Sequence, residues 1–162
     1  MNTPVQPAAP AGAPVTIRGF NHTSFTVGDL DRMIAFFVDG LGFKLLSRGP
    51  RDDALIQRMT GIAGASLEIA FVEAAGQRIE LISYSGPADR AVVRSRLCDA
   101  GSAHVGFDID DADAAVATAR RYGFELAGEI INIDAGPNRG RRVCYIRNAE
   151  GITIEFLQVA SS

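Results

Sequence analysis

The sequence predicts an α+β protein built from two tandem copies of one βαβββ module. Three observations lead to this prediction: the chain repeats itself, apolar and polar residues alternate along the expected strands, and an aspartate stands before each expected helix. Alternation with a period of two is typical of strands with one buried face, and an aspartate before an apolar helical pattern is typical of a helix N-terminus. Each module is expected to run strand, helix, strand and then a two-stranded hairpin.

The repeat is clearest around the two histidines and two of the glutamates. The segment NHTSFTVGD, which contains His22, aligns with AHVGFDIDD, which contains His104, 82 residues later. The segment AAGQRIELI, which contains Glu80, aligns with AEGITIEFL, which contains Glu155, 75 residues later. The same order of motifs in both halves predicts one supersecondary unit used twice.

This repeat divides a single domain over residues 17–162 into two modules. The first is expected at about 17–86 and the second at about 102–160, joined by a linker helix over about 87–101. Residues 1–16 are rich in Ala and Pro and lack the basic start and apolar centre of a secretory signal. We therefore expect a disordered N-terminal tail.

The helices are expected over residues 30–39 in the first module and 112–122 in the second. Asp29 and Asp111 are the N-cap candidates, and apolar residues follow each of them at helical spacing. After each helix a Gly-Phe pair opens the next strand. These signals place the helices at equivalent points of the two modules.

Alternation along the strands also indicates which way their side chains point. In the first module His22 and Glu80 lie opposite their apolar neighbours, and the second module repeats this arrangement with His104 and Glu155. The helices are expected to cover the apolar face of each sheet. The other faces, each with one histidine and one glutamate, would then curl around a cleft.

Composition excludes several function classes. The formal net charge of −3 argues against a nucleic-acid partner, which requires a broad field of Lys and Arg. No apolar run approaches the length needed to cross a bilayer. The two cysteines, Cys98 and Cys144, are far apart and in no metal-like or redox-like spacing, so we expect a reducing cytoplasm and no disulfide.

His22, Glu80, His104 and Glu155 form a candidate ligand set for one divalent metal ion. The sequence has only these two histidines, and each is matched with a repeated glutamate. A carboxylate within an apolar strand is costly to bury unless it is paired, protonated or bound to a cation. Imidazole and carboxylate together suit Ni, Zn, Co, Mn or Fe(II). Four such ligands on a six-coordinate ion would leave two positions for water or substrate.

These motifs resemble those of the glyoxalase, bleomycin-resistance and extradiol-dioxygenase superfamily, also called vicinal oxygen chelate proteins. The resemblance covers about residues 17–159 and is carried by the segments around the four candidate ligands. It implies an open eight-stranded, mostly antiparallel barrel-like sheet with helices outside, one bound metal ion and a homodimer. The order His, Glu, His, Glu is similar to the ligand pattern of glyoxalase I-like proteins.

The resemblance also implies a metal-dependent lyase or isomerase of the lactoylglutathione lyase-like type. Its small substrate, an anionic molecule or a thiol conjugate among the options, would chelate the metal through vicinal oxygens and lose a proton next to a carbonyl. Either Glu155 or Glu80 would be the catalytic base, with Glu155 favoured. The expected partner is thus a small molecule, and neither a nucleic acid nor a membrane.

Further side chains are candidates for substrate binding. Arg139 and Arg141 lie in a mobile, basic loop at the mouth of the second module, where guanidinium forks could grip an anion or could simply face solvent. Arg51 and Arg58 lie in the less regular stretch between strands of the first module. Tyr145 could face the cleft, although the alternation around it is too short to decide.

Other activities remain open on the same residues. One is an Fe(II)-dependent ring-cleaving dioxygenase, although that class typically uses two His and one Glu. A second is a methylmalonyl-CoA epimerase-like enzyme, although that class usually has Gln at the position of Glu80. A metal-dependent transferase or hydrolase that destroys antibiotics is a third. A drug-binding resistance protein shares the fold but ordinarily lacks the four ligands.

Overall fold

The computed structural model describes residues 15–159. The tail expected over residues 1–16 therefore lies almost wholly outside the described residues. Residues 15–22 contain no helix or strand and are mostly exposed. No helix in the described part of the chain is long and apolar enough to cross a membrane.

The first module forms a four-stranded sheet. In chain order it contains β1 (Thr23–Thr26), α1 (Leu30–Ala35), β2 (Lys44–Pro50), α2 (Asp53–Thr60), β3 (Ser66–Ala74) and β4 (Gln77–Gly86). The helix α1 continues directly into a π-helical segment, Phe36–Gly40. The strand order is β1-β4-β3-β2, with β1 parallel to β4 and the other pairs antiparallel. The strand after His22 thus lies beside the strand of Glu80.

The second module repeats this topology. It contains β5 (Val105–Ile109), α3 (Ala112–Arg120), β6 (Phe124–Leu126), β7 (Ile131–Asn132), β8 (Arg142–Asn148) and β9 (Thr153–Gln158). The strand order is β5-β9-β8-β6, with β5 parallel to β9, and β7 also pairs with β8. The strand after His104 thus lies beside the strand of Glu155.

Both predicted helix starts are confirmed. The Asp29 side chain accepts a hydrogen bond from the backbone N–H of Arg32 at 2.9 Å, and the Asp111 side chain accepts one from Ala114 at 3.0 Å. These bonds satisfy backbone donors that have no partner in the first turn of a helix. The two N-caps therefore start the helix of each module at the equivalent position, directly after the first strand of that module.

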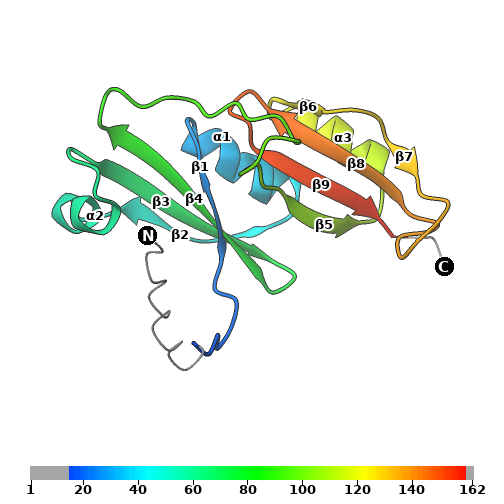
Figure 1. The fold of residues 1–162 in the computed structure, drawn as a ribbon, viewed down its shortest axis with the longest axis horizontal. Helices are drawn as coiled ribbons and strands as arrows, with labels where there is room; N and C mark the ends of the chain where they lie inside the picture. Colours follow the sequence, from blue (N-terminus) through cyan, green and yellow to red (C-terminus); the bar gives the residue numbers. More distant parts are fainter. Residues whose placement is uncertain (1–14, 160–162) are drawn as a thin grey trace, which may run out of the picture.

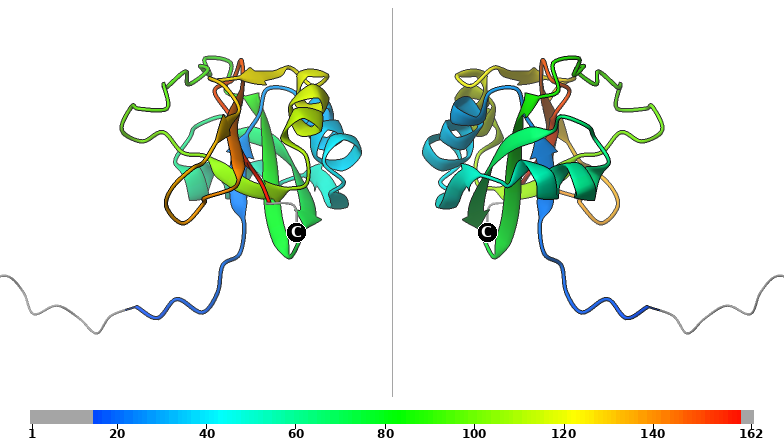
Figure 2. Two further views of the ribbon diagram at one scale, coloured as in Figure 1. Left: turned by 90° about the vertical axis from the view of Figure 1, so that its right-hand side faces the viewer. Right: turned by 90° about the vertical axis from the view of Figure 1, so that its left-hand side faces the viewer.

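One hydrophobic core joins the two modules. The helices α1 and α3 lie side by side on one flank of the molecule (Figures 1 and 2). The ring of Phe36, at the end of α1, stacks on the ring of Phe124 in β6, with centroids 4.5 Å apart. The residues that flank both glutamates enter the same core: Ile79, Leu81, Ile154 and Phe156. Each glutamate therefore projects from the opposite face of its sheet.

A second, smaller core lies between α2 and that opposite face in the first module. Ile56 of α2 packs with Leu67 and Ile69 of β3, and partly buried Ile82 and Tyr84 pack against them. Strand register places Ile82 two residues from Glu80, on the same face. The helix α2 thus covers part of the face that carries Glu80.

The linker helix predicted over residues 87–101 is wrong. The structure has no helix there, and the segment runs as an extended crossover between the two sheets (Figure 1). Val92 and Val93 are 54% and 75% exposed. A short helix is stable mainly when it buries an apolar face, and these side chains have none to pack on. A side-chain hydrogen bond from Arg147 to the backbone oxygen of Ser95 ties the crossover to the second module.

The α+β class and the repeated module are confirmed. Within residues 15–159, however, the strands form a four-stranded and a five-stranded sheet and no closed barrel. The sheets are divided at the module boundary because the modules pack through their helices rather than by hydrogen bonds between strand edges. The expected open, barrel-like arrangement is therefore divided into two sheets within one chain.

Candidate metal centre

The first half of the candidate site lies between the start of β1 and the middle of β4. Ser24 pairs with Glu80 in the parallel register, which brings His22 to the Glu80 side chain. The Nε2 atom of His22 lies 3.3 Å from Oε2 of Glu80. The side chains are 33% and 13% exposed, respectively. The histidine therefore contacts solvent, while most of the carboxylate is covered.

The second half repeats this geometry. Gly106 pairs with Glu155 in the parallel register of β5 and β9. The Nε2 atom of His104 lies 3.4 Å from Oε2 of Glu155. Gly106 lies close to this pair, since a Cβ atom there would lie 3.3 Å from the same carboxylate oxygen. The two halves of the sequence thus build the same pair of donors twice.

Aromatic side chains from the neighbouring strands complete each pair. Phe71 of β3 stands opposite Glu80, and Tyr145 of β8 stands opposite Glu155. The ring of His22 meets Phe71 edge to face at 5.8 Å. The ring of His104 meets Tyr145 in the same way at 5.3 Å.

Tyr145 adds a polar contact that the first half lacks. Its hydroxyl donates to Oε1 of Glu155 at 2.8 Å. Burial raises the pKa of Tyr145, and the hydrogen bond to Glu155 raises it further. The phenol therefore stays protonated at neutral pH and acts as a donor to the carboxylate.

The four predicted ligands come together as two pairs, not as one cluster. Among residues 15–159, no group of three or more His, Cys, Asp or Glu side chains is close enough to hold a metal ion. The repeat positions each pair through local strand register. The spacing between the pairs depends instead on how the modules pack, which the repeat does not specify.

Each pair fits a metal ion in donor type and spacing. Two donor atoms at about 2.0–2.2 Å from one ion stand about 3.0–3.4 Å apart at the usual coordination angles. Nε2 of His22 faces the Glu80 carboxylate, and Oδ1 of Asn21 lies within hydrogen-bond distance of the other ring nitrogen, Nδ1, at 2.7 Å. Such an outer hydrogen bond is typical of metal-binding histidines.

The predicted substrate residues lie in different settings. Arg141 is paired with Asp108 at 2.5 Å, and Arg51 donates to the backbone oxygens of Gly49 and Pro50. Arg58 on α2 and Arg139 are exposed. Tyr145 is the candidate that directly contacts a predicted ligand, because Cys144 and Ile146 on either side of it enter the core.

Sequence reasoning missed Phe71. Phe71 and Tyr145 each stand opposite the glutamate of their own module. The 75-residue offset that aligns the two glutamates pairs Phe71 with Ile146 instead, because the turn of the second hairpin is one residue longer.

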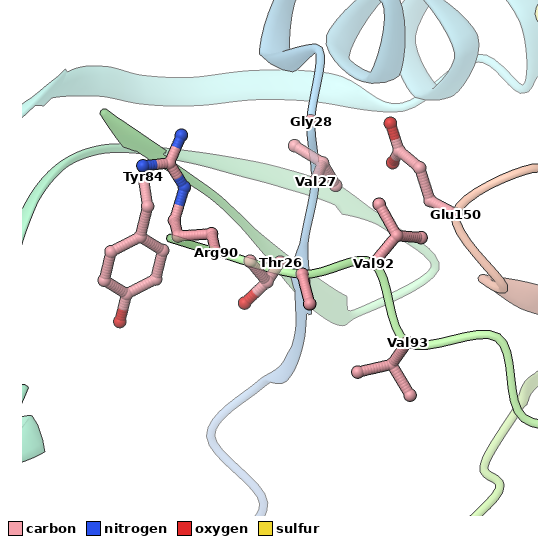
Figure 3. A pocket seen from close by; sticks show the side chains of 9 residues that line it. Thr26, Val27, Gly28, Tyr84, Arg90, Val92, Val93 and Glu150 are labelled. Atoms are coloured by element: carbon pink, nitrogen blue, oxygen red, sulfur yellow. The ribbon is translucent and has the colours of Figure 1, made fainter. Parts of the chain in front are cut away.

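A cavity of about 400 Å³ lies beneath the crossover segment, away from both pairs (Figure 3). Thr26, Tyr84, Arg90 and Val92 line it, together with Glu150. The Oε2 atom of Glu150 is buried without a hydrogen-bond partner among the described residues. None of the four candidate ligands lines this cavity. The candidate metal centre is therefore identified from its histidine and glutamate side chains and not from the position of a cavity.

The paired modules and repeated His-Glu pairs define the class to which the chain belongs. Residues 19–156 match the family model of the Glyoxalase/Bleomycin resistance protein/Dioxygenase superfamily. The protein is a member of this superfamily, and the resemblance noted in its sequence is confirmed.

Individual relatives share most of the chain. A 2-epi-5-epi-valiolone epimerase from an Actinomyces species is 28% identical over 144 residues, covering 86% of this chain and 78% of the relative. A probable lactoylglutathione lyase from Vibrio cholerae is 27% identical over 145 residues, covering 85% of this chain and 88% of the relative. The crystal structure of a glyoxalase family protein from Bacillus cereus matches with a TM-score of 0.77 at 28% identity. The match covers 93% of this chain and 100% of the Bacillus cereus chain.

Proposed function

We propose that this protein is a metal-dependent isomerase or lyase of the glyoxalase I-like type. It acts on a small substrate with oxygens on adjacent carbons, and it moves a proton on the carbon next to a carbonyl. The observation that carries the proposal is the repeated pair of donors, an imidazole nitrogen 3.3 or 3.4 Å from a carboxylate oxygen. A lactoylglutathione lyase among the relatives supports this reaction class.

His22, Glu80, His104 and Glu155 would hold the ion, with Ni or Co as the first candidates and Zn, Mn or Fe(II) as others. When bound, a divalent ion would stabilise negative charge on the substrate oxygens as the proton leaves. One of the two carboxylates accepts that proton and returns it to the neighbouring carbon. The half-buried setting of both glutamates limits competition from water.

The site is completed by a second copy of the chain. Each pair is open to solvent, and the described residues bring no third ligand to either one. We therefore propose a homodimer in which the first module of one copy faces the second module of the other. A two-fold axis would then create two identical four-ligand sites.

The face that carries Glu80 offers apolar surface for such contact. Leu55 and Met59 on α2 are 49% and 71% exposed, and Ile62 just after the helix is 40% exposed. α2 packs on the Glu80 face of the sheet through Ile56. Exposed apolar groups beside an incomplete site are typical of an interface.

A second candidate reaction is epimerisation at a carbon next to a carbonyl. The 2-epi-5-epi-valiolone epimerase among the relatives supports it. Both reactions begin with loss of the same kind of proton and differ in where the proton returns. The same ligand set therefore serves either one.

The experiment that tests the function is metal analysis of purified protein, followed by an activity assay. Wild type is compared with His22→Ala and His104→Ala, and each stripped protein is reloaded with one metal at a time. The assay follows isomerisation of the methylglyoxal–glutathione hemithioacetal. We expect one ion per chain in wild type, loss of the ion in both variants, and activity restored by Ni or Co.

The possible outcomes separate the parts of the proposal. An ion without hemithioacetal turnover would retain the metal centre and direct the assay to epimerase substrates. Absence of any bound ion in wild type would show that the two His-Glu contacts are simple ion pairs, and the proposed function would be wrong.

A further inference from the structure

We propose that Tyr145 is a positioning residue that holds Glu155 in place as a ligand, and that Glu80 is the carboxylate that moves and takes the substrate proton. This inference rests on the proposed function. It reverses the preference for Glu155 as the base that the resemblance gave. It assigns different roles to two residues that the repeat makes equivalent.

The two glutamates differ in one contact. Both oxygens of Glu155 are engaged, Oε2 at 3.4 Å from His104 and Oε1 at 2.8 Å from the Tyr145 hydroxyl. At the equivalent place Glu80 faces Phe71, which has no hydroxyl to donate. Among the described residues, only Oε2 of Glu80 has a partner, His22 at 3.3 Å.

Burial does not account for a difference between them. The side chains of Glu80 and Glu155 are 13% and 18% exposed, so both are largely covered. Each lies in the centre of a hairpin strand and beside a parallel strand. The hydroxyl of Tyr145 is therefore the feature that distinguishes the two environments.

A hydrogen bond to one oxygen restricts rotation of the whole carboxylate, because its two oxygens move together. A ligand that must leave the metal, reach a substrate carbon and return needs a carboxylate that can rotate. The Glu80 carboxylate can rotate because no hydroxyl holds its second oxygen among the described residues. A carboxylate held by an outer hydrogen bond is in turn the better permanent ligand, since such contacts contribute about 10–100-fold to metal affinity.

The step assigned to Glu80 is a proton transfer. The C–H bond next to the substrate carbonyl breaks, and its proton passes to a Glu80 oxygen. The electron pair of that bond forms a C=C bond while the carbonyl π pair moves onto oxygen, which gives an enediolate. The proton then returns from Glu80 to the former carbonyl carbon, and the other carbon becomes the carbonyl as its hydroxyl proton passes to the neighbouring oxygen. No other reactant is consumed.

The first test measures Co(II) affinity by calorimetric titration of the stripped full-length protein. Tyr145→Phe removes one hydroxyl and is expected to weaken binding by about 10–100-fold. Glu155→Gln should weaken binding at least 10 times more than Glu80→Gln does. Adding Tyr145→Phe to Glu155→Gln should cause no further loss, because the hydroxyl acts through Glu155. Tyr122→Phe, which removes the hydroxyl of a partly buried tyrosine away from the four candidate ligands, is the control.

The second test uses the repeat itself. Phe71→Tyr places a hydroxyl opposite Glu80 and should hold that carboxylate as Tyr145 holds Glu155. Co(II) affinity should be retained or increased, whereas kcat for the methylglyoxal–glutathione hemithioacetal should fall at least 10-fold with little change in KM. Glu80→Gln should lower kcat by about 10²–10⁴-fold, the usual contribution of a general base.

Tyr145→Phe binding Co(II) as tightly as wild type would overturn the inference, as would equal losses in Glu80→Gln and Glu155→Gln. If wild type binds no Co(II), the metal centre is wrong and this inference falls with it. If wild type binds Co(II) but does not turn over the hemithioacetal, the proposed substrate class fails while the affinity order still decides the roles of the two glutamates.

Discussion

The two cysteines of this chain lie in opposite environments. Cys98 is exposed in the crossover segment, and Cys144 is buried in the inter-module core. Burial raises the pKa of the Cys144 thiol above its ordinary value of 9.0, and Arg142 only partly opposes this effect. Because the thiolate is the reactive form, Cys144 should be unreactive in the folded protein.

Labelling with Ellman's reagent tests this expectation. One thiol should react rapidly in the native protein and two after denaturation, and Cys98→Ser should abolish the rapid phase. The unfolded chain also ionises at Cys144 before the folded chain does, so the free energy of unfolding should decrease as pH rises above about 9. Two thiols that react equally fast in the native protein would contradict the buried position.

At the scale of single residues, the repeat and the alternation predict which strand, and which face of it, carries a side chain. His22 and Glu80 face each other because β1 and β4 are parallel neighbours. The contact of Tyr145 with Glu155 depends on the antiparallel register of β8 and β9. The alternation around Tyr145 is too short to show that register.

Among the elements, the contact between α1 and the second module carries much of the packing. Phe36 is fully buried, and its ring stacks on Phe124 across the module boundary. Phe36→Ala should therefore lower the free energy of unfolding by about 3–5 kcal/mol. Urea denaturation measures this loss.

Phe20→Ala is the matched control, because that side chain is 72% exposed. Its effect should stay within about 0.5 kcal/mol. A comparable small effect of Phe36→Ala would mean that the modules do not depend on each other through this contact.

Element prediction succeeded where apolar spacing and an N-cap agree and failed in the crossover. Asp29 and Asp111 mark their helices correctly. Residues 91–100 contain two alanines and one leucine that favour a helix, but the structure has no helix there, and Val92, Val93 and Leu97 are exposed. Tertiary packing, not propensity, decided that segment.

At the scale of the whole molecule, the proposed homodimer makes a prediction about mixtures. His22→Ala and His104→Ala would each damage both sites of such a dimer. A mixed dimer of the two variants keeps one intact site, so random reassembly should restore about a quarter of the wild-type sites. Bound Co(II) and activity after co-refolding measure the recovery.

The control mixture is His22→Ala with Glu80→Gln, which place both lesions in the first module. Every site of that mixed dimer is damaged, and no activity should return. Recovery in neither mixture, with an active wild type, would mean that each site lies within one chain.

The arrangement of the modules was the part that the sequence could not supply. The repeat predicts two similar units but not whether they join through sheet edges or through helices. One contact across the module boundary, Phe36 with Phe124, joins residues that periodicity marks only as apolar.

The presence of α2 in only one module has a consequence for substrate orientation. A site made from two identical walls would have its own two-fold axis and could not tell one end of a substrate from the other. In the proposed site one wall carries α2 and Phe71, and the other carries β7 and Tyr145. The two ends of a substrate would then contact different groups, so divergence of the two halves would hold an unsymmetrical substrate in one orientation.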